Sequence, residues 1–135
     1  LVRKLYEARR RGDQDVVRSL LASDVRWHDP YPPPFGGDFF GADEVVAWMF
    51  GPLEHEMDDS GLELHDVVAN DRHAVALVNW WTVLEGRRMD GREIGVYHVQ
   101  DARITEVWFT TEDKQASDSF FSRGEPIDDS PPQQS

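Results

Sequence analysis

The residues that could carry out acid–base chemistry gather around position 28. Asp29 closes the segment 24–29, which predicts a short strand that ends at Pro30. A carboxyl group at the mouth of an apolar pocket has a raised pKa, and this suits a general base. Asp29 is therefore the leading catalytic candidate. Its alternative role is capping or hydrogen bonding within the loop that follows.

Two histidines are the next candidates. Neighbouring strand residues point to opposite faces, so His28 faces away if Asp29 faces the pocket, and a structural or dimer-face role is expected for it. Pairing about Glu85-Gly86 also places His98 outward, although one bulge would invert this face. His98 therefore stays a catalytic candidate beside Asp29.

Several aromatic residues could line a flat hydrophobic ligand or form the core. Strand alternation turns Val78, Trp80 and Thr82 inward, and the next two strands turn Glu93, Gly95, Tyr97 and Phe109 inward. The candidate ligand contacts are Trp27, Tyr31, Trp48, Trp80, Tyr97 and Phe109. Trp81 faces outward and needs cover, which a homodimer packed sheet to sheet through Trp81 and Trp108 would supply.

The elements that must position these residues begin with helices. Val2, Leu5 and Tyr6 recur at helical spacing until Gly12 interrupts them, and Asp13 is a good N-cap for a second helix. A third helix carries Asp43 and Glu44 in its first turn and stops at Gly51-Pro52. The Pro- and Gly-rich segment 31–41 predicts a loop.

From residue 62 onward the hydrophobic period changes to two. Strands are predicted over 62–69, 73–84, 87–99 and 104–111, with a tight turn at Glu85-Gly86 and a terminal helix over 112–121. Asp90-Gly91 is either a bulge or a competing turn. Helices followed by strands indicate an α+β fold, with three N-terminal helices packed on a curved antiparallel sheet whose concave face leaves a pocket.

Composition excludes several function classes. The chain has 135 residues, of which 14 are Lys or Arg and 26 are Asp or Glu, for a net charge of −12. This surface repels nucleic acid and anionic membranes. There are no cysteines, no metal-ligand spacing and no nucleotide-binding loop, so no cofactor and no metal are expected. A cytoplasmic location is expected, with one domain over 1–122 and a disordered tail over 123–135.

Four segments carry a family resemblance: Gly12-Asp13, Trp27-His28-Asp29-Pro30, residues 39–46 (FFGADEVV) and residues 97–108 (YHVQDARITEVW). They resemble the NTF2-like superfamily, and more narrowly its SnoaL-like and ketosteroid-isomerase-like members, over residues 1–122. The resemblance implies a cystatin-like cone around one small-molecule pocket.

The resemblance also shows where this chain departs from those enzymes. Asp29-Pro30 matches the general base of ketosteroid isomerases, but Leu5 and Gly95 stand at the two oxyanion-donor positions, and neither side chain can donate. Tyr6 is expected to face elsewhere, because a helix turns by about 100° per residue. SnoaL-type cyclases carry an acid close after a Trp like Trp108, whereas the first acids here are Glu112 and Asp113, several residues further on.

Three functional hypotheses follow. The first is cofactor-independent acid–base chemistry, such as isomerisation, dehydration or cyclisation, on a hydrophobic oxygenated small molecule, with Asp29 as the base. The second is a non-catalytic small-molecule binding protein, which the missing donors favour. The third is a domain whose cone is filled by its own Trp and Phe side chains.

Overall fold

The chain begins with a helical pair. The computed structural model describes residues 1–56 and 59–122, so the tail expected at 123–135 lies outside the described residues. Helices α1 (Val2–Arg11) and α2 (Gln14–Leu20) are separated by Gly12, which adopts a left-handed conformation with φ of 73°. The Asp13 carboxylate accepts a hydrogen bond of 3.2 Å from the Val16 N–H and so caps α2. The predicted break and cap are confirmed.

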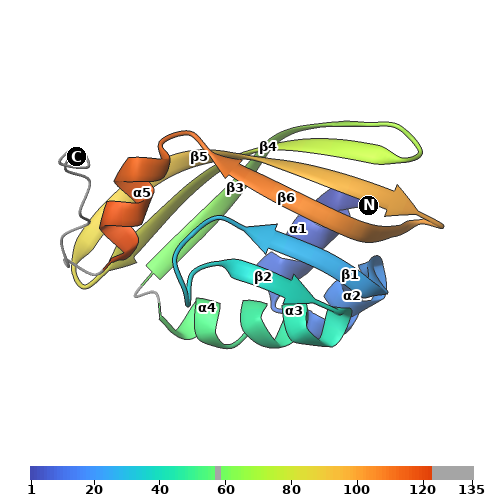
Figure 1. Ribbon diagram of the computed structural model, residues 1–135, viewed down its shortest axis with the longest axis horizontal. Coiled ribbons are helices and arrows are strands. Elements are labelled where there is room, and N and C mark those ends of the chain that lie inside the picture. The colour runs from blue at the N-terminus through green and yellow to red at the C-terminus, as the bar shows by residue number, and fades with distance from the viewer. Residues whose placement is uncertain (57–58, 123–135) are drawn as a thin grey trace, which may run out of the picture.

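The strands form one sheet of six. They are β1 (Leu21–Asp29), β2 (Gly37–Phe40), β3 (Asp59–Ala69), β4 (His73–Leu84), β5 (Arg87–Gln100) and β6 (Arg103–Thr111), in the spatial order β2-β1-β6-β5-β4-β3 (Figure 1). All neighbours are antiparallel except β1 and β6, which are parallel. Strand β2 pairs with β1 inside the segment predicted as a loop, so that part of the prediction was wrong. Its four residues are too few to show a period among the flanking glycines and prolines.

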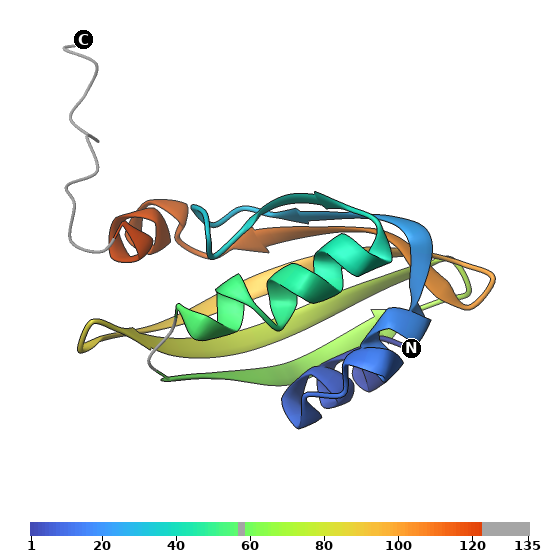
Figure 2. The same cartoon turned by 90° about the horizontal axis from the view of Figure 1, so that it is seen from below.

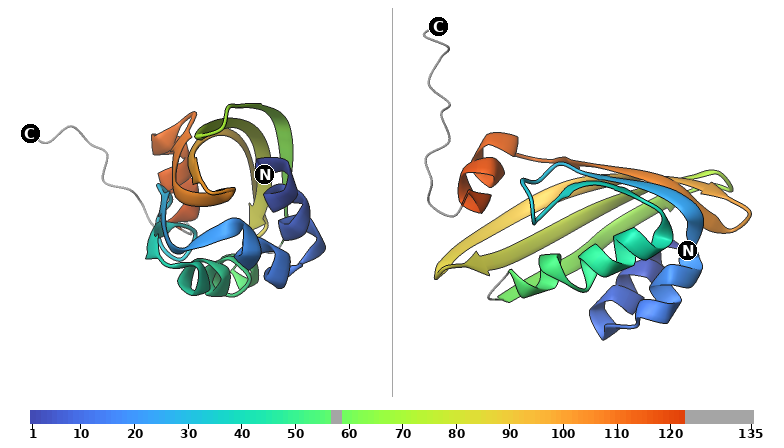
Figure 3. Two further views of the ribbon diagram at one scale, coloured as in Figure 1. Left: turned by 90° about the vertical axis from the view of Figure 1, so that its right-hand side faces the viewer. Right: turned by 60° about the horizontal axis from the view of Figure 1, so that its bottom comes forward.

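The sheet curls around a hollow that helices close on one side. Helices α3 (Ala42–Met49) and α4 (Pro52–His55) lie along one flank, α1 and α2 along the other, and α5 (Lys114–Phe121) at one end (Figures 2 and 3). The predicted α+β class is confirmed, with more helices than the three expected at the N-terminus. Leu5, Trp27 and Val45 are among the core residues that hold helices and sheet together. Among the described residues, no helix is long and apolar enough to cross a bilayer.

The central hairpin keeps its register along its whole length. Glu85 and Gly86 both have positive φ (53° and 78°), as the predicted tight turn requires. Trp80 pairs with Gly91 without a register shift, so Asp90-Gly91 is neither a bulge nor a turn. A Cβ at position 91 would collide with the Trp80 ring, which explains the glycine.

The convex face of the sheet carries exposed apolar side chains. Val68, Leu77, Ile94 and Trp108 are 66, 37, 43 and 37 % exposed. Trp81 is half-buried: the Arg88 guanidinium lies 4.8 Å from the centre of its ring, and the residue also lines the cavity described below. We call the surface formed by Val68, Leu77, Ile94 and Trp108 the convex apolar patch.

Candidate active site

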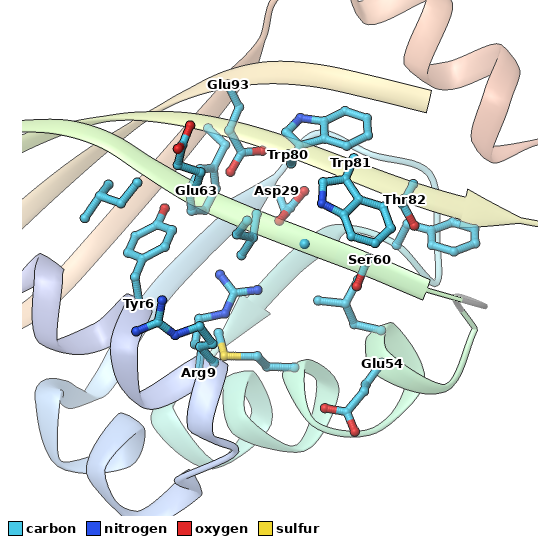
Figure 4. A pocket seen from close by; sticks show the side chains of 18 of the residues that line it. Tyr6, Arg9, Asp29, Glu54, Ser60, Glu63, Trp80, Trp81, Thr82 and Glu93 are labelled. Carbon is cyan, nitrogen blue, oxygen red and sulfur yellow. The ribbon is translucent and has the colours of Figure 1, made fainter. Parts of the chain in front are cut away.

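A cavity of about 830 Å³ occupies the hollow between the curved sheet and the helices. Its apolar wall includes Trp80 and Trp81 of β4, Phe109 of β6, Phe121 of α5 and Phe35 of the loop after β1, together with side chains of α3, α4 and β3. Its polar lining consists of the acids Glu7, Asp29, Glu54, Glu63 and Glu93, the arginines Arg3, Arg9 and Arg10, and the hydroxyl-bearing Tyr6, Tyr31, Ser60 and Thr82. Figure 4 shows several of these residues. The wall thus combines a large apolar surface with polar groups of both charges, as a pocket for a small organic molecule can. The hypothesis that the cone is filled by its own side chains is wrong.

Asp29 is the last residue of β1, and its side chain points into this cavity (Figure 4). Its Oδ1 atom is buried and finds no hydrogen-bond partner among the described residues. Burial, with the nearby Glu93, raises the pKa of Asp29 well above its ordinary value, against the opposing effects of the Tyr31 backbone, the charge of Arg9 and the nearby Trp27 indole N–H. The carboxyl group can therefore hold a proton in a pH range where an exposed aspartate would have lost it.

Glu93 is a second carboxyl group in the same cavity, supplied by β5. Its Oε1 accepts a hydrogen bond of 2.7 Å from the Tyr31 hydroxyl. Burial raises the pKa of Glu93 although this hydrogen bond and the charge of Arg9 both lower it. Two neighbouring carboxyl groups with raised pKa values favour a state in which one is protonated and the other ionised.

Two tyrosines form a second polar contact beside the acids. The Tyr6 and Tyr97 hydroxyls lie 3.0 Å apart in a buried hydrogen bond that links α1 to β5. Burial is the main cause that raises the pKa of both phenols, so both stay neutral and can donate. Tyr6 lines the cavity, whereas Tyr97 reaches it only through Tyr6.

Arg9 is a cation among these acids. It lies one helical turn after Tyr6 on α1, lines the cavity, and its guanidinium carbon is 5.9 Å from the centre of the Tyr6 ring. Its positive charge acts on Asp29, Glu93 and both tyrosines. Helix α1 thus contributes both a hydroxyl and a positive charge to the site.

The six predicted ligand contacts divide into two groups. Tyr31, Trp80 and Phe109 line the cavity. The catalytic candidate Asp29 also lines it. Trp27, Trp48 and Tyr97 do not line it. Trp27 is a core residue packed 5.4 Å from Phe109, and the Trp48 Nε1 donates to the Pro34 carbonyl. Correct strand parity was not enough for Trp27 and Tyr97, because the Phe109 ring packs against both, while Trp48 lies on α3 and stacks on Phe39.

His98 does not join Asp29, which corrects its place as a catalytic candidate. Its ring lies on the convex face against Trp108, at 4.8 Å between ring centres, and is absent from the cavity lining. His28 also faces outward, as expected: Nδ1 lies 2.9 Å from Asp38 and Nε2 lies 2.8 Å from Glu106. The hydrogen bond to Asp38 is the largest cause that raises the pKa of His28, followed by the hydrogen bond to Glu106. No bulge inverted these strand faces.

Tyr6, Arg9 and Glu93 are functional candidates that the sequence analysis missed or misplaced. Leu5 is buried in the core and Tyr6 faces the cavity, so the expectation that Tyr6 points elsewhere was wrong. The side of α1 that lines the cavity carries Tyr6 and Arg9, together with Arg3, Glu7 and Arg10. The three-residue spacing of Tyr6 and Arg9, and the inward parity of Glu93, were the signals available.

The later acids do not reach the cavity. Glu112 pairs with Arg92 at 2.6 Å, and Asp113 caps α5 by accepting from the Ala116 N–H. Within residues 1–56 and 59–122, no three His, Asp or Glu residues are grouped as a metal site. The polar lining instead supplies five titratable acids, phenol hydroxyls and three guanidinium groups, which together can move protons and balance charge.

Comparison with known proteins agrees with this architecture. An uncharacterized protein of Mycobacterium tuberculosis is 29 % identical over 123 residues, covering 90 % of this chain and 94 % of its own. The crystal structure of an NTF2-like protein from Burkholderia pseudomallei is 25 % identical, with a TM-score of 0.72 over 85 % of this chain and 89 % of that one. TerC, co-crystallized with polyporic acid, shares the fold at 16 % identity, with a TM-score of 0.73 over 93 % and 95 % of the two chains. The SnoaL-like domain profile matches residues 2–107. The chain therefore belongs to the SnoaL-like domain family, within the NTF2-like fold.

Proposed function

We propose that this protein is a cofactor-independent acid–base enzyme that acts on a small, hydrophobic, oxygenated molecule. The observation that carries the proposal is the Asp29 carboxyl group, which lines the cavity and has one buried oxygen without a partner. An unsatisfied buried carboxyl group costs free energy, and active sites are where such costs are commonly met. TerC, of the same fold, was co-crystallized with a small organic acid, which supports a small-molecule role for this cavity.

The two acids suit complementary steps. In its ionised form Asp29 takes a proton from a carbon next to a carbonyl group, and the C–H electron pair moves onto the carbonyl oxygen. When Glu93 carries the proton that the two acids share, it can return a proton to another atom of the substrate or to a leaving oxygen. Protonation of another atom of the substrate gives an isomerisation, and protonation of a leaving oxygen gives a dehydration. Attack of the enolate on a second carbonyl group gives a cyclisation.

A panel of keto- and hydroxy-substituted aromatic and alicyclic compounds tests this function. Binding is followed by the fluorescence of Trp80, which lines the cavity, and turnover by mass spectrometry or exchange of carbon-bound hydrogen for deuterium. The Asp29→Asn variant is expected to keep binding and lose at least about a hundredfold in exchange or turnover, the usual contribution of a general base. Exchange at the wild-type rate in this variant would refute the role of Asp29.

The alternative is a non-catalytic small-molecule binding protein. One observation favours it: the hydroxyls of Tyr6 and Tyr97 bond each other and that of Tyr31 bonds Glu93, so these donors are already engaged. Tight binding without exchange or turnover of any compound in the panel would establish this alternative.

A further inference from the structure

Arg9 is half-buried and lines the cavity, yet it has neither a hydrogen bond nor an ion pair with any described residue. Arg18 bonds Asp43 at 2.9 Å and Arg92 bonds Glu112 at 2.6 Å, and arginines without such a partner, such as Arg26 and Arg103, are exposed to solvent. The Arg9 guanidinium instead lies 5.9 Å from the centre of the Tyr6 ring. A guanidinium always carries its charge and offers five N–H donors, so partial burial without an acceptor is unfavourable.

The position of Arg9 in the last turn of α1 does not explain its inward direction. Basic residues there interact favourably with the helix dipole, but the exposed Arg10 and Arg11 serve the same purpose. Arg10 and Arg3 also line the cavity, Arg10 from an exposed position and Arg3 in an ion pair with Asp66. Arg9 alone of the three is half-buried. Its side chain extends instead toward the space that Asp29 and Glu93 share (Figure 4).

The acids of the cavity do not use up the charge of Arg9. It forms no ion pair with Asp29 or Glu93, and burial raises the pKa of both carboxyl groups in spite of it. If the two acids share one proton, their single negative charge balances Arg9. When Asp29 takes a proton from a ligand, the group formed by Asp29, Glu93 and Arg9 becomes more positive by one charge, which a negative oxygen on the ligand beside Arg9 can match.

We propose that Arg9 is the anion-binding residue of the cavity, and that the ligand carries one negative oxygen on a hydrophobic skeleton. The oxygen is a carboxylate or an ionised enol or phenol, and the skeleton lies against Trp80 and Phe109. Tyr6, whose hydroxyl lines the same side, is placed to hold this oxygen beside Arg9. This inference rests on the proposed small-molecule function and names the charge of its ligand.

Calorimetry with 2-naphthoate and 2-naphthamide tests the inference, because the two have nearly the same shape and differ in charge. Charge-assisted hydrogen bonds are worth about 1.5–3 kcal/mol, so Arg9→Gln is expected to weaken naphthoate binding at least about tenfold and leave the amide unchanged. Arg9→Lys, which keeps the charge and loses the forked donors, should fall in between. Lys4→Gln is the matched control: it removes one charge from the same helix outside the cavity and should leave naphthoate binding within about twofold.

A spectroscopic arm distinguishes the two sources of negative oxygen. 4-Nitrophenol absorbs visible light only when ionised, so its absorbance reports the form that is bound. The ligand oxygen is a phenolate or enolate if bound 4-nitrophenol ionises at lower pH on the wild type than on Arg9→Gln and naphthoate binds weakly. It is a carboxylate if naphthoate binds strongly and the ionisation of 4-nitrophenol does not differ.

The inference is overturned if wild type binds neither anion better than the amide, or if Arg9→Gln weakens acid and amide equally. Failure of the proposed function gives a different result. If the anions bind through Arg9 and Asp29→Asn changes no exchange or turnover, then the binding residue is correct and the acid–base role is wrong.

Discussion

The Tyr31–Glu93 hydrogen bond allows a sharp test of the electrostatics of the cavity. The Tyr31 hydroxyl donates to Glu93 at 2.7 Å, while its ring packs 5.3 Å from Phe121 and 5.9 Å from Trp80. Tyr31→Phe removes the hydroxyl and keeps the ring, so the change in unfolding free energy isolates the hydrogen bond.

The size of the effect depends on the protonation of Glu93. A hydrogen bond to a charged group is worth about 1.5–3 kcal/mol, and one between neutral groups about 0.5–1.5 kcal/mol. The bond favours the ionised carboxylate, so Tyr31→Phe raises the pKa of Glu93 further. The loss of stability caused by Tyr31→Phe should therefore grow by about 1 kcal/mol as the pH rises through the already raised pKa of Glu93.

Urea unfolding over a pH series measures this growth. A double-mutant cycle with Glu93→Gln should remove the pH-dependent part, because the amide does not ionise in this range. Tyr97→Phe is the matched control, since it removes a hydroxyl bonded to neutral Tyr6 and should cost the same at each pH. A Tyr31→Phe penalty that does not change with pH, or that changes equally in the Glu93→Gln background, would refute the reasoning.

Four further changes have defined outcomes. Burial raises the pKa of Asp29, so the native state binds more protons than the unfolded chain, and wild-type stability should fall as the pH rises from the ordinary aspartate range through the raised native value. Asp29→Asn should abolish this fall and exceed wild type in stability at alkaline pH; urea unfolding that shows an unchanged slope contradicts it. His98→Asn should leave ligand binding and turnover within about twofold, because the ring lies on the convex face, and a tenfold loss would contradict its placement. Gly91→Ala should cost about 1–3 kcal/mol in thermal unfolding, because the new Cβ meets the Trp80 ring, and an unchanged Tm argues against that contact. We propose that the convex apolar patch packs against a second copy; sedimentation equilibrium should show a dimer that Leu77→Glu shifts toward monomer, and a monomeric wild type would end this proposal.

Strand alternation is the part of the site that sequence reasoning predicts well. The turn at Glu85-Gly86 fixes the β4–β5 register, so the inward direction of Trp80 and Glu93 follows from counting residues. Asp29 is similarly fixed by the Pro that ends its strand. These assignments needed only local geometry, because each depends on a period of two and a known turn.

The positions of other site residues depend on how the helices pack on the sheet. Local sequence patterns do not encode this packing. The face that α1 turns to the cavity depends on how the helix packs against the sheet, and in the assembled fold Tyr6 lines the cavity while Leu5 lies in the core. Trp27 has the predicted parity and still misses the cavity, because Phe109 packs against it. The approach of Arg9 to Glu93 joins residues 84 positions apart and becomes visible only once helix and sheet are assembled.

The most direct test of the account is a carbon-13 NMR titration of the Asp29 and Glu93 side-chain carboxyl groups in the ligand-free protein. The resonances are assigned with Asp29→Asn and Glu93→Gln. Both carboxyl groups are expected to titrate above their ordinary ranges, and Glu93→Gln is expected to bring the pKa of Asp29 down. Two independent titrations at ordinary aspartate and glutamate values would contradict a buried, coupled acid pair in the cavity.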